Sequence, residues 1–122
     1  MRTRISIIVA LLLAFAVHCA NAQTAQQKRS IERAISLYDF GHCIEARTEL
    51  RNIRQTLSPV TDREAIERVD YYLALCTTEL KMAEAEGRLK RFLADYQGSI
   101  YANELQFTLA TLAMTEDNIA LA

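Results

Sequence analysis

The sequence predicts an all-α protein built from antiparallel helix hairpins, and two observations predict this class. Apolar residues recur every three or four positions along most of the chain, which places them on one face of successive helices. Residues that break helices separate these periodic segments at Gly41, Pro59 and Gly98. Because the joints are short, consecutive helices are expected to lie antiparallel.

Five helices are expected after residues 1–22. Proline cannot continue a helix and disfavours helical geometry in the residue before it, so the second helix is expected to stop at Ser58 and Pro59. A run of three polar residues near the C-terminus indicates a turn into a sixth helix that remains incomplete. The expected helices cover residues 25–39, a segment from Gly41 to Ser58, 62–79, 82–96 and 100–114, and the turn is Glu116, Asp117 and Asn118.

Charged side chains of the second helix are expected to form a solvated face that adds no stability. This helix holds like-charge pairs four residues apart and no opposite-charge pair at three or four residues. In the third helix, by contrast, Arg63 with Glu67 and Glu64 with Arg68 have the spacing of stabilising ion pairs. The charged residues of the second helix are Glu45, Arg47, Glu49, Arg51 and Arg54.

The N-terminus has the three parts of a secretory signal peptide. Arg2 and Arg4 form a basic start, and residues 5–17 form an apolar run. Residues 20–22, Ala-Asn-Ala, form a small-x-small cleavage site before Gln23. A transmembrane helix needs roughly 20 apolar residues, more than this run provides. We therefore expect a signal peptide at residues 1–22 and an exported domain at residues 23–122.

Two alternatives to a cleaved signal peptide remain open. Cys19 follows the apolar run and would be the lipid attachment site of an envelope lipoprotein. The residue before it is His18, where a lipidation motif has a small residue. The second alternative is an uncleaved N-terminal anchor.

Charge and composition exclude several classes of function. Removing residues 1–22 takes two of the fourteen basic residues and leaves twelve against fifteen acidic ones, a net charge of −3. This balance does not favour a nucleic-acid partner, which would require a basic face. His42 is the one histidine left, and the chain has no Gly-rich phosphate loop or nucleophile elbow. We expect no catalysis, no cofactor and no metal.

Cys43 and Cys76 are expected on neighbouring helices. In an oxidising compartment two such thiols join as a disulfide if their Cα atoms come within about 7 Å. The alternative is a pair of buried, reduced thiols. In either case the two cysteines are expected to have a structural role.

The second helices of the hairpins indicate an internal repeat. The segments GHCIEARTELRNI, KMAEAEGRLKRFL and EDNIALA align with Ala46, Ala85 and Ala122 at equivalent positions. A small side chain at this position allows two helices to pack closely. The interval between these alanines is longer than the period of about 34 residues of tetratricopeptide repeats.

Residues 24–122 nevertheless resemble tetratricopeptide repeats. The stretch FLADYQGSIYANELQFTLA is similar to the periplasmic branch associated with outer-membrane assembly and Tol-Pal, in which an aromatic residue, a Tyr-Pro turn, Ser and Tyr-Ala join two repeats. Three features depart from the pattern. Gln97 replaces the turn proline, Ser30 stands where tryptophan is common, and the second hairpin has no glycine in its turn at Leu80 and Lys81. The matching positions are Ala34, Leu37, Gly41, Ala46, Leu50 and Ile53 in a first repeat, Leu73, Ala85, Leu89 and Phe92 in a second, and Leu109, Ala110 and Ala122 in a third.

This resemblance implies a right-handed α-solenoid of about two and a half repeats in the periplasm or at the outer membrane. Such a solenoid offers a concave surface to a protein or peptide partner. Ile31 and Ile35 hold positions where some relatives bind a carboxylate, which these side chains cannot do. Inter-repeat packing is the alternative role for each aromatic candidate. The candidate partner-binding residues are Tyr38, Tyr71, Thr78, Phe107 and Thr111.

Repeat arrays usually need about three units and a polar capping helix. We therefore expect either that this sequence is the N-terminal part of a longer array or that two copies cover each other's open ends as a homodimer. The expected function is that of an exported scaffold that binds a protein or peptide partner in the bacterial cell envelope. The alternative is a small secreted helical protein of structural role, or an envelope lipoprotein, without a peptide groove.

Overall fold

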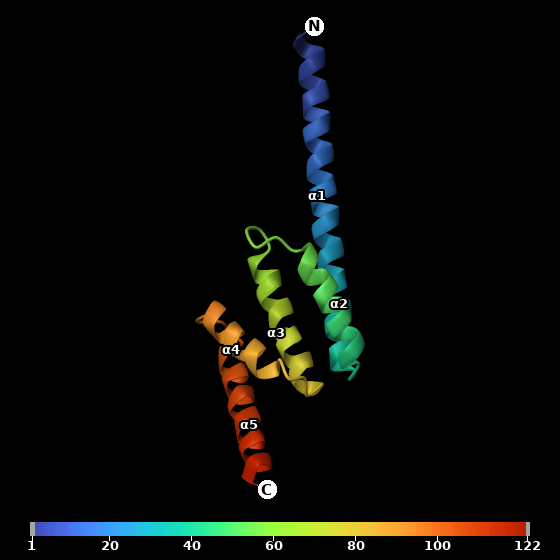
Figure 1. Ribbon diagram of the computed structural model, residues 1–122. Helices are drawn as coiled ribbons and strands as arrows, with labels where there is room; N and C mark the ends of the chain where they lie inside the picture. The colour runs from blue at the N-terminus through green and yellow to red at the C-terminus, as the bar shows by residue number, and fades with distance from the viewer. Residues whose placement is uncertain (1, 122) are drawn as a thin grey trace.

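The chain is entirely helical in the part that the structure describes. A computed structural model describes the backbone of residues 2–121 and the side chains of residues 4–14 and 25–117. The predicted all-α class is confirmed (Figure 1). The five helices are α1 (Arg2–Asp39), α2 (Cys43–Thr56), α3 (Arg63–Glu79), α4 (Ala85–Asp95) and α5 (Ala102–Leu121).

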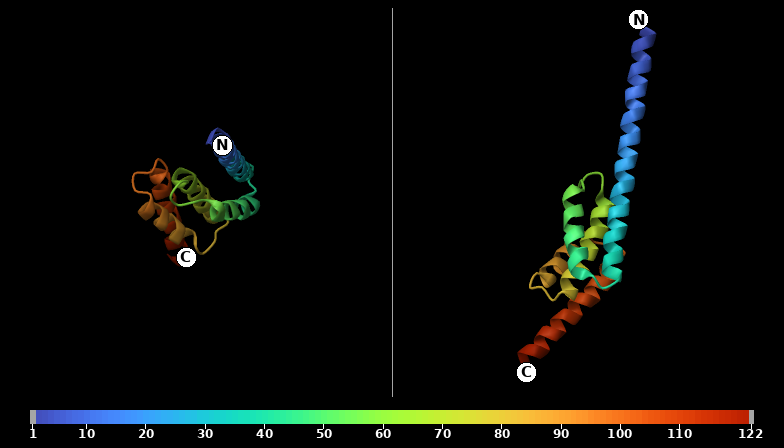
Figure 2. Two further views of the ribbon diagram at one scale, coloured as in Figure 1. Left: turned by 90° about the horizontal axis from the view of Figure 1, so that it is seen from above. Right: turned by 90° about the vertical axis from the view of Figure 1, so that its right-hand side faces the viewer.

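Each helix packs against the next one in the chain, and α1 also contacts α3. The N- and C-termini lie at opposite ends of the molecule (Figure 1). The first half of α1 projects beyond the body formed by the other helices (Figure 2). Side chains 4–14 on this projecting part are all exposed.

Helix α1 begins well before residue 25, where the first helix was expected to start. Its backbone passes residues 22 and 23 without a break. His18, Cys19 and the Ala-Asn-Ala of residues 20–22 lie outside the residues whose side chains are described. Within the described part of the chain, we find no helix that combines the length and the apolar character needed to cross a membrane.

Helix α5 also differs from its prediction. It runs without interruption to Leu121, and the expected turn at residues 116–118 is absent. This run contains neither Gly nor Pro, and Glu116 and Asp117 are exposed positions that a helix accommodates. Ala122, the third repeat position, lies outside the described residues.

Helix α3 is the central element because it is buried on two sides. One side joins a core with α1 and α2, and the other joins a core with α4 and α5. We expected a single inner face for this helix, yet every residue from Leu73 to Thr77 is buried. The first core contains Ile31, Ala34, Ile35, Ala46, Leu50, Leu57, Ile66, Val69, Leu73 and Cys76, and the second contains Tyr71, Ala74, Leu75, Leu89, Phe92 and Leu105.

The two cysteines meet at the boundary of α2 and α3 as free thiols. Cys43 is half-buried at the start of α2, and Cys76 is buried in α3. Burial, with a smaller contribution from the neighbouring Cys43, raises the pKa of the Cys76 thiol to about 12. The structure thus corresponds to the reduced pair.

The turns that end α1 and α3 have the same hydrogen bonds. After α1, Gly41 N–H donates to the Tyr38 carbonyl at 2.9 Å and His42 N–H donates to the Leu37 carbonyl at 2.8 Å. After α3, the same two bonds occur at 3.0 and 3.1 Å, from Lys81 to Thr78 and from Met82 to Thr77. Both are Schellman motifs, with a left-handed residue that frees the chain to reverse.

The left-handed residue is Gly41 in the first turn, with φ 84°, and Lys81 in the second, with φ 53°. A side chain in this conformation costs roughly 1–2 kcal/mol. Lys81→Gly is therefore expected to raise the free energy of unfolding by about 0.5–1 kcal/mol, after the entropic cost of glycine. Gly41→Ala is expected to lower it by about 1 kcal/mol, although an added Cβ meets no atom within 4 Å.

Urea unfolding of the two variants measures this effect. Gly87→Ala is the matched control, because Gly87 lies inside α4 without a positive φ and with open space around it. This control is expected to stabilise the chain by about 0.5–1 kcal/mol. A stabilising effect of Gly41→Ala would contradict the need for a left-handed residue in this turn.

Three of the five charged residues of α2, Arg47, Glu49 and Arg54, pair with residues outside this helix, which corrects the expected solvated face. Arg33 of α1 contacts Glu49 at 3.0 Å, and Arg54 contacts Asp70 of α3 at 2.8 Å. The pairs expected within α3 are absent from the described residues. Arg68 instead contacts Glu32 of α1, and Glu67 accepts a hydrogen bond from Ser99. These ion pairs join neighbouring helices and do not stabilise one helix alone.

Candidate functional site

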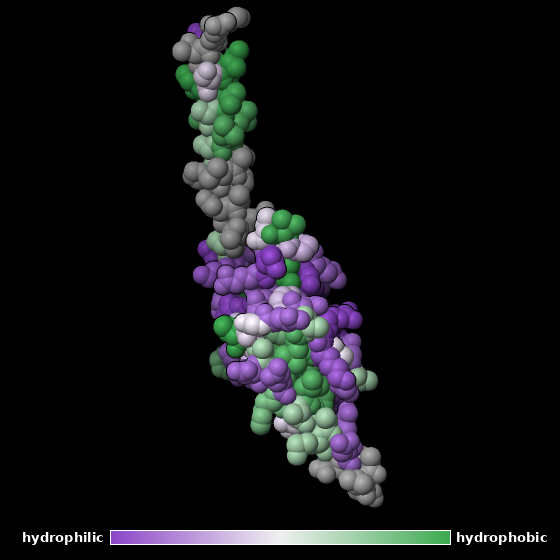
Figure 3. Space-filling model, turned by 90° about the vertical axis from the view of Figure 1, so that its left-hand side faces the viewer, coloured by the Kyte–Doolittle hydropathy of each residue, from purple (hydrophilic) through white to green (hydrophobic). Residues whose placement is uncertain are grey.

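An apolar groove lies between α5 and the segment that joins α3 to α4. Its cavity volume is about 530 Å³. The space-filling view shows hydrophobic residues gathered on the half of the body nearer the C-terminus, with hydrophilic residues around them (Figure 3). The groove is lined by Thr78, Lys81, Met82, Ala83, Ala85, Glu86, Phe107, Thr108, Thr111, Leu112, Thr115 and Glu116.

Helix α5 positions the groove because it packs on α4 with one face only. Leu105 is fully buried on that face, and Leu109 and Leu112 are half-buried beside the second core. Phe107 lies on another face and is 74% exposed. Met114 follows two turns later and is 66% exposed. Phe107 thus adds an exposed ring to the apolar lining of the cavity, and contiguous exposed apolar patches mark interaction sites.

Four threonines line the groove, and their hydroxyl groups are already satisfied. Each donates to the carbonyl four residues earlier in its own helix, at 2.9 Å in all four cases. The hydroxyl donors are thus not available to a ligand, and threonine contributes its methyl group to the groove. The four are Thr78, Thr108, Thr111 and Thr115.

Three of the predicted partner-binding residues meet in this groove: Thr78, Phe107 and Thr111. Tyr38 and Tyr71 do not. Tyr71 is only 7% exposed, which corrects its expected place on an accessible surface. Its ring stacks on Tyr101 with centroids 4.1 Å apart, and its hydroxyl donates to Glu104 Oε2 at 2.7 Å. This is the packing role left open for the aromatic candidates.

Tyr38 is half-buried and belongs to the same aromatic cluster. Its ring lies edge-on to Tyr72, with centroids 5.6 Å apart, and Tyr72 lies 4.9 Å from Tyr71. Burial raises the pKa of Tyr38 to about 12, with a smaller contribution from the charge of Glu79. Burial and the hydrogen bond to Glu104 raise the pKa of Tyr71. The cluster joins α1, α3 and α5 and is structural.

Met82, Ala85 and Leu112 also line the groove, although the sequence did not lead us to expect them there. Ala85 was expected to pack closely between helices, and it is buried, but it also forms part of the groove floor. The available signal was Met82, because a flexible apolar side chain directly after a helix end is typical of adaptable binding surfaces.

Comparisons with models of protein families, with curated proteins and with solved structures found no match to this chain. What the groove can do follows from its lining. Phenyl, thioether and methyl groups bind apolar side chains, and charges lie at Lys81, Glu86 and Glu116. The arrangement is suited to recognition of an amphipathic segment.

Proposed function

We propose that this chain is an exported helical scaffold that binds an amphipathic helix of a partner protein in the groove beside α5. One observation carries the proposal: Phe107 is 74% exposed at an apolar cavity of about 530 Å³. Burying such a ring contributes about 1.5–3 kcal/mol to association. Recognition of this kind uses apolar anchors at intervals of three and four along the bound helix.

A helix is the proposed occupant because it continues the packing order of the fold. Helices α2, α3 and α4 each pack along at least two other helices, whereas α5 packs along α4 and contacts α3 through side chains of the second core, such as the hydrogen bond from Tyr71 to Glu104. Phe107, Ala110 and Met114 have helical spacing and are exposed on α5. A partner helix placed along them would contact α5 as the internal helices contact one another.

We further propose that the fold is a tetratricopeptide-like solenoid, of which α1 with α2 and α3 with α4 are two hairpins. The matching Schellman turns inside the two hairpins support this. The helix boundaries also support it, because α2 and α4 end at Thr56 and Asp95, the same interval that separates Ala46 from Ala85. The helices that follow begin at that interval too. Helix α5 would open a third unit.

Export to the envelope rests on residues 1–22. The basic start, the apolar run and the Ala-Asn-Ala site are those of a signal peptide. Side chains 4–14 are exposed, so their removal would leave both cores intact. N-terminal sequencing of the chain from a periplasmic fraction is expected to begin at Gln23.

Site-specific photo-crosslinking in cells tests the binding proposal. A photo-reactive phenylalanine analogue at position 107 of the full chain is expected to yield an adduct with a segment of another protein whose apolar residues have helical spacing. Position 100 is the matched control, because Ile100 is apolar and 87% exposed but does not line the groove. No such adduct is expected there.

Two outcomes contradict the proposal. Adducts with the same proteins from both positions would mean that capture reflects exposure alone. Adducts from position 107 only with a second copy of the chain would make the groove a self-association surface.

A further inference from the structure

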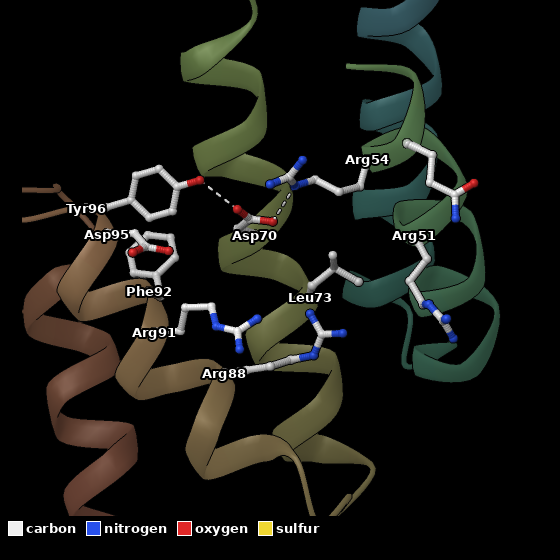
Figure 4. Close-up of a pocket in the computed structure, with 10 residues that line it drawn as sticks. Arg51, Arg54, Asp70, Leu73, Arg88, Arg91, Phe92, Asp95 and Tyr96 are labelled. Carbon is white, nitrogen blue, oxygen red and sulfur yellow. Dashed lines mark hydrogen bonds and ion pairs between the residues drawn. The ribbon is translucent and has the colours of Figure 1, made fainter. Parts of the chain in front are cut away.

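A second cleft lies between α2 and α4, over α3, and shares no lining residue with the groove beside α5. Its volume is about 330 Å³. Helices α2 and α4 do not pack against each other, and α3 forms the floor between them with Asp70 and Leu73 (Figure 4). The cleft is lined by Arg51, Arg54, Gln55, Asp70, Leu73, Arg88, Arg91, Phe92, Asp95 and Tyr96.

Four arginines line this cleft, two from each flanking helix. Arg51 and Arg54 stand three residues apart on α2, and Arg88 and Arg91 have the same spacing on α4. Arginines three residues apart lie on the same side of a helix. Each pair therefore lies on the side of its helix that borders the cleft (Figure 4).

One of the four arginines, Arg54, is already engaged by Asp70. Arg54 Nε lies 2.8 Å from Asp70 Oδ1, and the Tyr96 hydroxyl donates to Asp70 Oδ2 at 2.6 Å (Figure 4). Both oxygens of Asp70 are thus occupied. This network holds α2, α3 and the end of α4 together and fixes one end of the cleft.

The other three arginines retain free donors. Arg88 Nε is buried and has no hydrogen-bond partner in the described part of the chain. Glu84 Oε1 lies 3.7 Å from it and accepts a hydrogen bond from Arg47 at 2.9 Å. Arg51 and Arg91 are exposed and have no ion pair within the described residues. A buried donor without a partner is costly unless a ligand satisfies it.

The charges of the cleft do not balance. Four arginines face two aspartates, an excess of two positive charges, and adding Arg47 with Glu84 leaves that excess unchanged. The whole chain has a net charge of −1, so the excess is a local feature. The apolar side chains Leu73 and Phe92 lower the local dielectric and strengthen attraction for an anion.

We infer that this cleft binds a phosphate group that carries two negative charges, held by Arg51, Arg88 and Arg91. A phosphate monoester carries about −1.5 to −2 at neutral pH, which matches the excess, whereas a single carboxylate carries half of it. Guanidinium groups bind phosphate oxygens with two donors at once. Free phosphates and the headgroups of phospholipids share this chemistry.

Binding to the full chain is measured in two arms. The first titrates inorganic phosphate by calorimetry at constant ionic strength. The second measures binding to vesicles of phosphatidylcholine with and without phosphatidic acid, a phosphomonoester lipid. The variant Arg51→Gln with Arg91→Gln is expected to bind at least about tenfold more weakly in the arm that detects binding, because it removes two of the three guanidinium groups that hold the phosphate.

The control variant is Arg29→Gln with Arg63→Gln, which changes the net charge equally. Arg29 and Arg63 are exposed and lie outside the cleft. Unchanged circular dichroism establishes that both variants are folded. Loss of binding in the cleft variant but not in the control variant supports the inference. The arm in which binding is detected identifies the source of the phosphate group, free phosphate or lipid. No binding in either arm, or equal loss in both variants, overturns it.

Discussion

Replacing Leu50 or Leu89 by alanine is expected to lower the free energy of unfolding by about 2–5 kcal/mol in each case. Both side chains are fully buried. They hold equivalent positions of α2 and α4, one in each core. Each truncation leaves a cavity that the surrounding helices fill only in part. A domain of this size has roughly 5–15 kcal/mol of stability, so either change removes a large share of it.

Urea unfolding followed by circular dichroism measures both values. Ile100→Ala is the control for loss of the same kind of apolar side chain at a position 87% exposed, and its effect is expected to stay within about 0.5 kcal/mol. If Leu89→Ala costs no more than this control, then α4 is not a core element equivalent to α2.

The second large effect expected is unfolding at alkaline pH, caused by ionisation of the tyrosines in the aromatic cluster. Tyr38 and Tyr71 have raised pKa values, mainly from burial. Burial and the hydrogen bond to Asp70 likewise raise the pKa of Tyr96. A group whose pKa is raised in the folded state contributes stability that is complete below its unfolded value, about 10 for tyrosine, and is lost as the pH rises toward the folded value. Helicity is therefore expected to fall between about pH 10 and about pH 12.

Parallel measurement of tyrosinate absorbance and circular dichroism tests this link. Ionisation of the cluster is expected to coincide with loss of helix, because the folded state holds these hydroxyls protonated. Tyr71→Phe removes one of the ionising groups and is expected to move the transition to higher pH. Full tyrosine ionisation near pH 10 in a chain that keeps its helicity would contradict the structural role of the cluster.

The helix order was predictable because strong local signals end the helices. Gly41 supplies a left-handed residue and Pro59 cannot continue a helix, so the observed boundaries of α2 and α3 lie close to the expected ones. The end of α5 was not predictable in this way, since residues 116–118 carry no such signal. The Schellman turn at Lys81 was not predictable from the sequence, because lysine is uncommon in the left-handed region.

Contacts between helices could not be predicted from residue spacing within a single helix. The spacing rules for ion pairs describe one helix, whereas Arg33, Arg54 and Arg68 pair with carboxylates on other helices. Tyr71 was placed on an accessible face because helical periodicity assigns one inner side, but α3 is enclosed from two sides. Phe107, a candidate partner-binding residue, is exposed because it lies off the face of α5 that Leu105 and Leu109 form.

A repeated sequence motif could have indicated the arginine cleft. The motif Arg-x-x-Arg occurs in α2 as residues 51–54 and in α4 as residues 88–91. Since α2 and α4 both pack against α3, the two motifs are brought to neighbouring surfaces. Whether their charges are neutralised depends on Asp70 and Glu84 in three dimensions, which spacing alone does not reveal.

The most direct test of the proposed function is the affinity of the captured partner segment, as a synthetic peptide, for the wild-type chain and two variants. Phe107→Ala is expected to weaken binding by about 2 kcal/mol, close to thirtyfold, because an aromatic anchor in a groove is a typical binding hot spot. Ile100→Ala is expected to leave the affinity unchanged. Equal affinities for all three chains would show that the groove beside α5 is not the binding site.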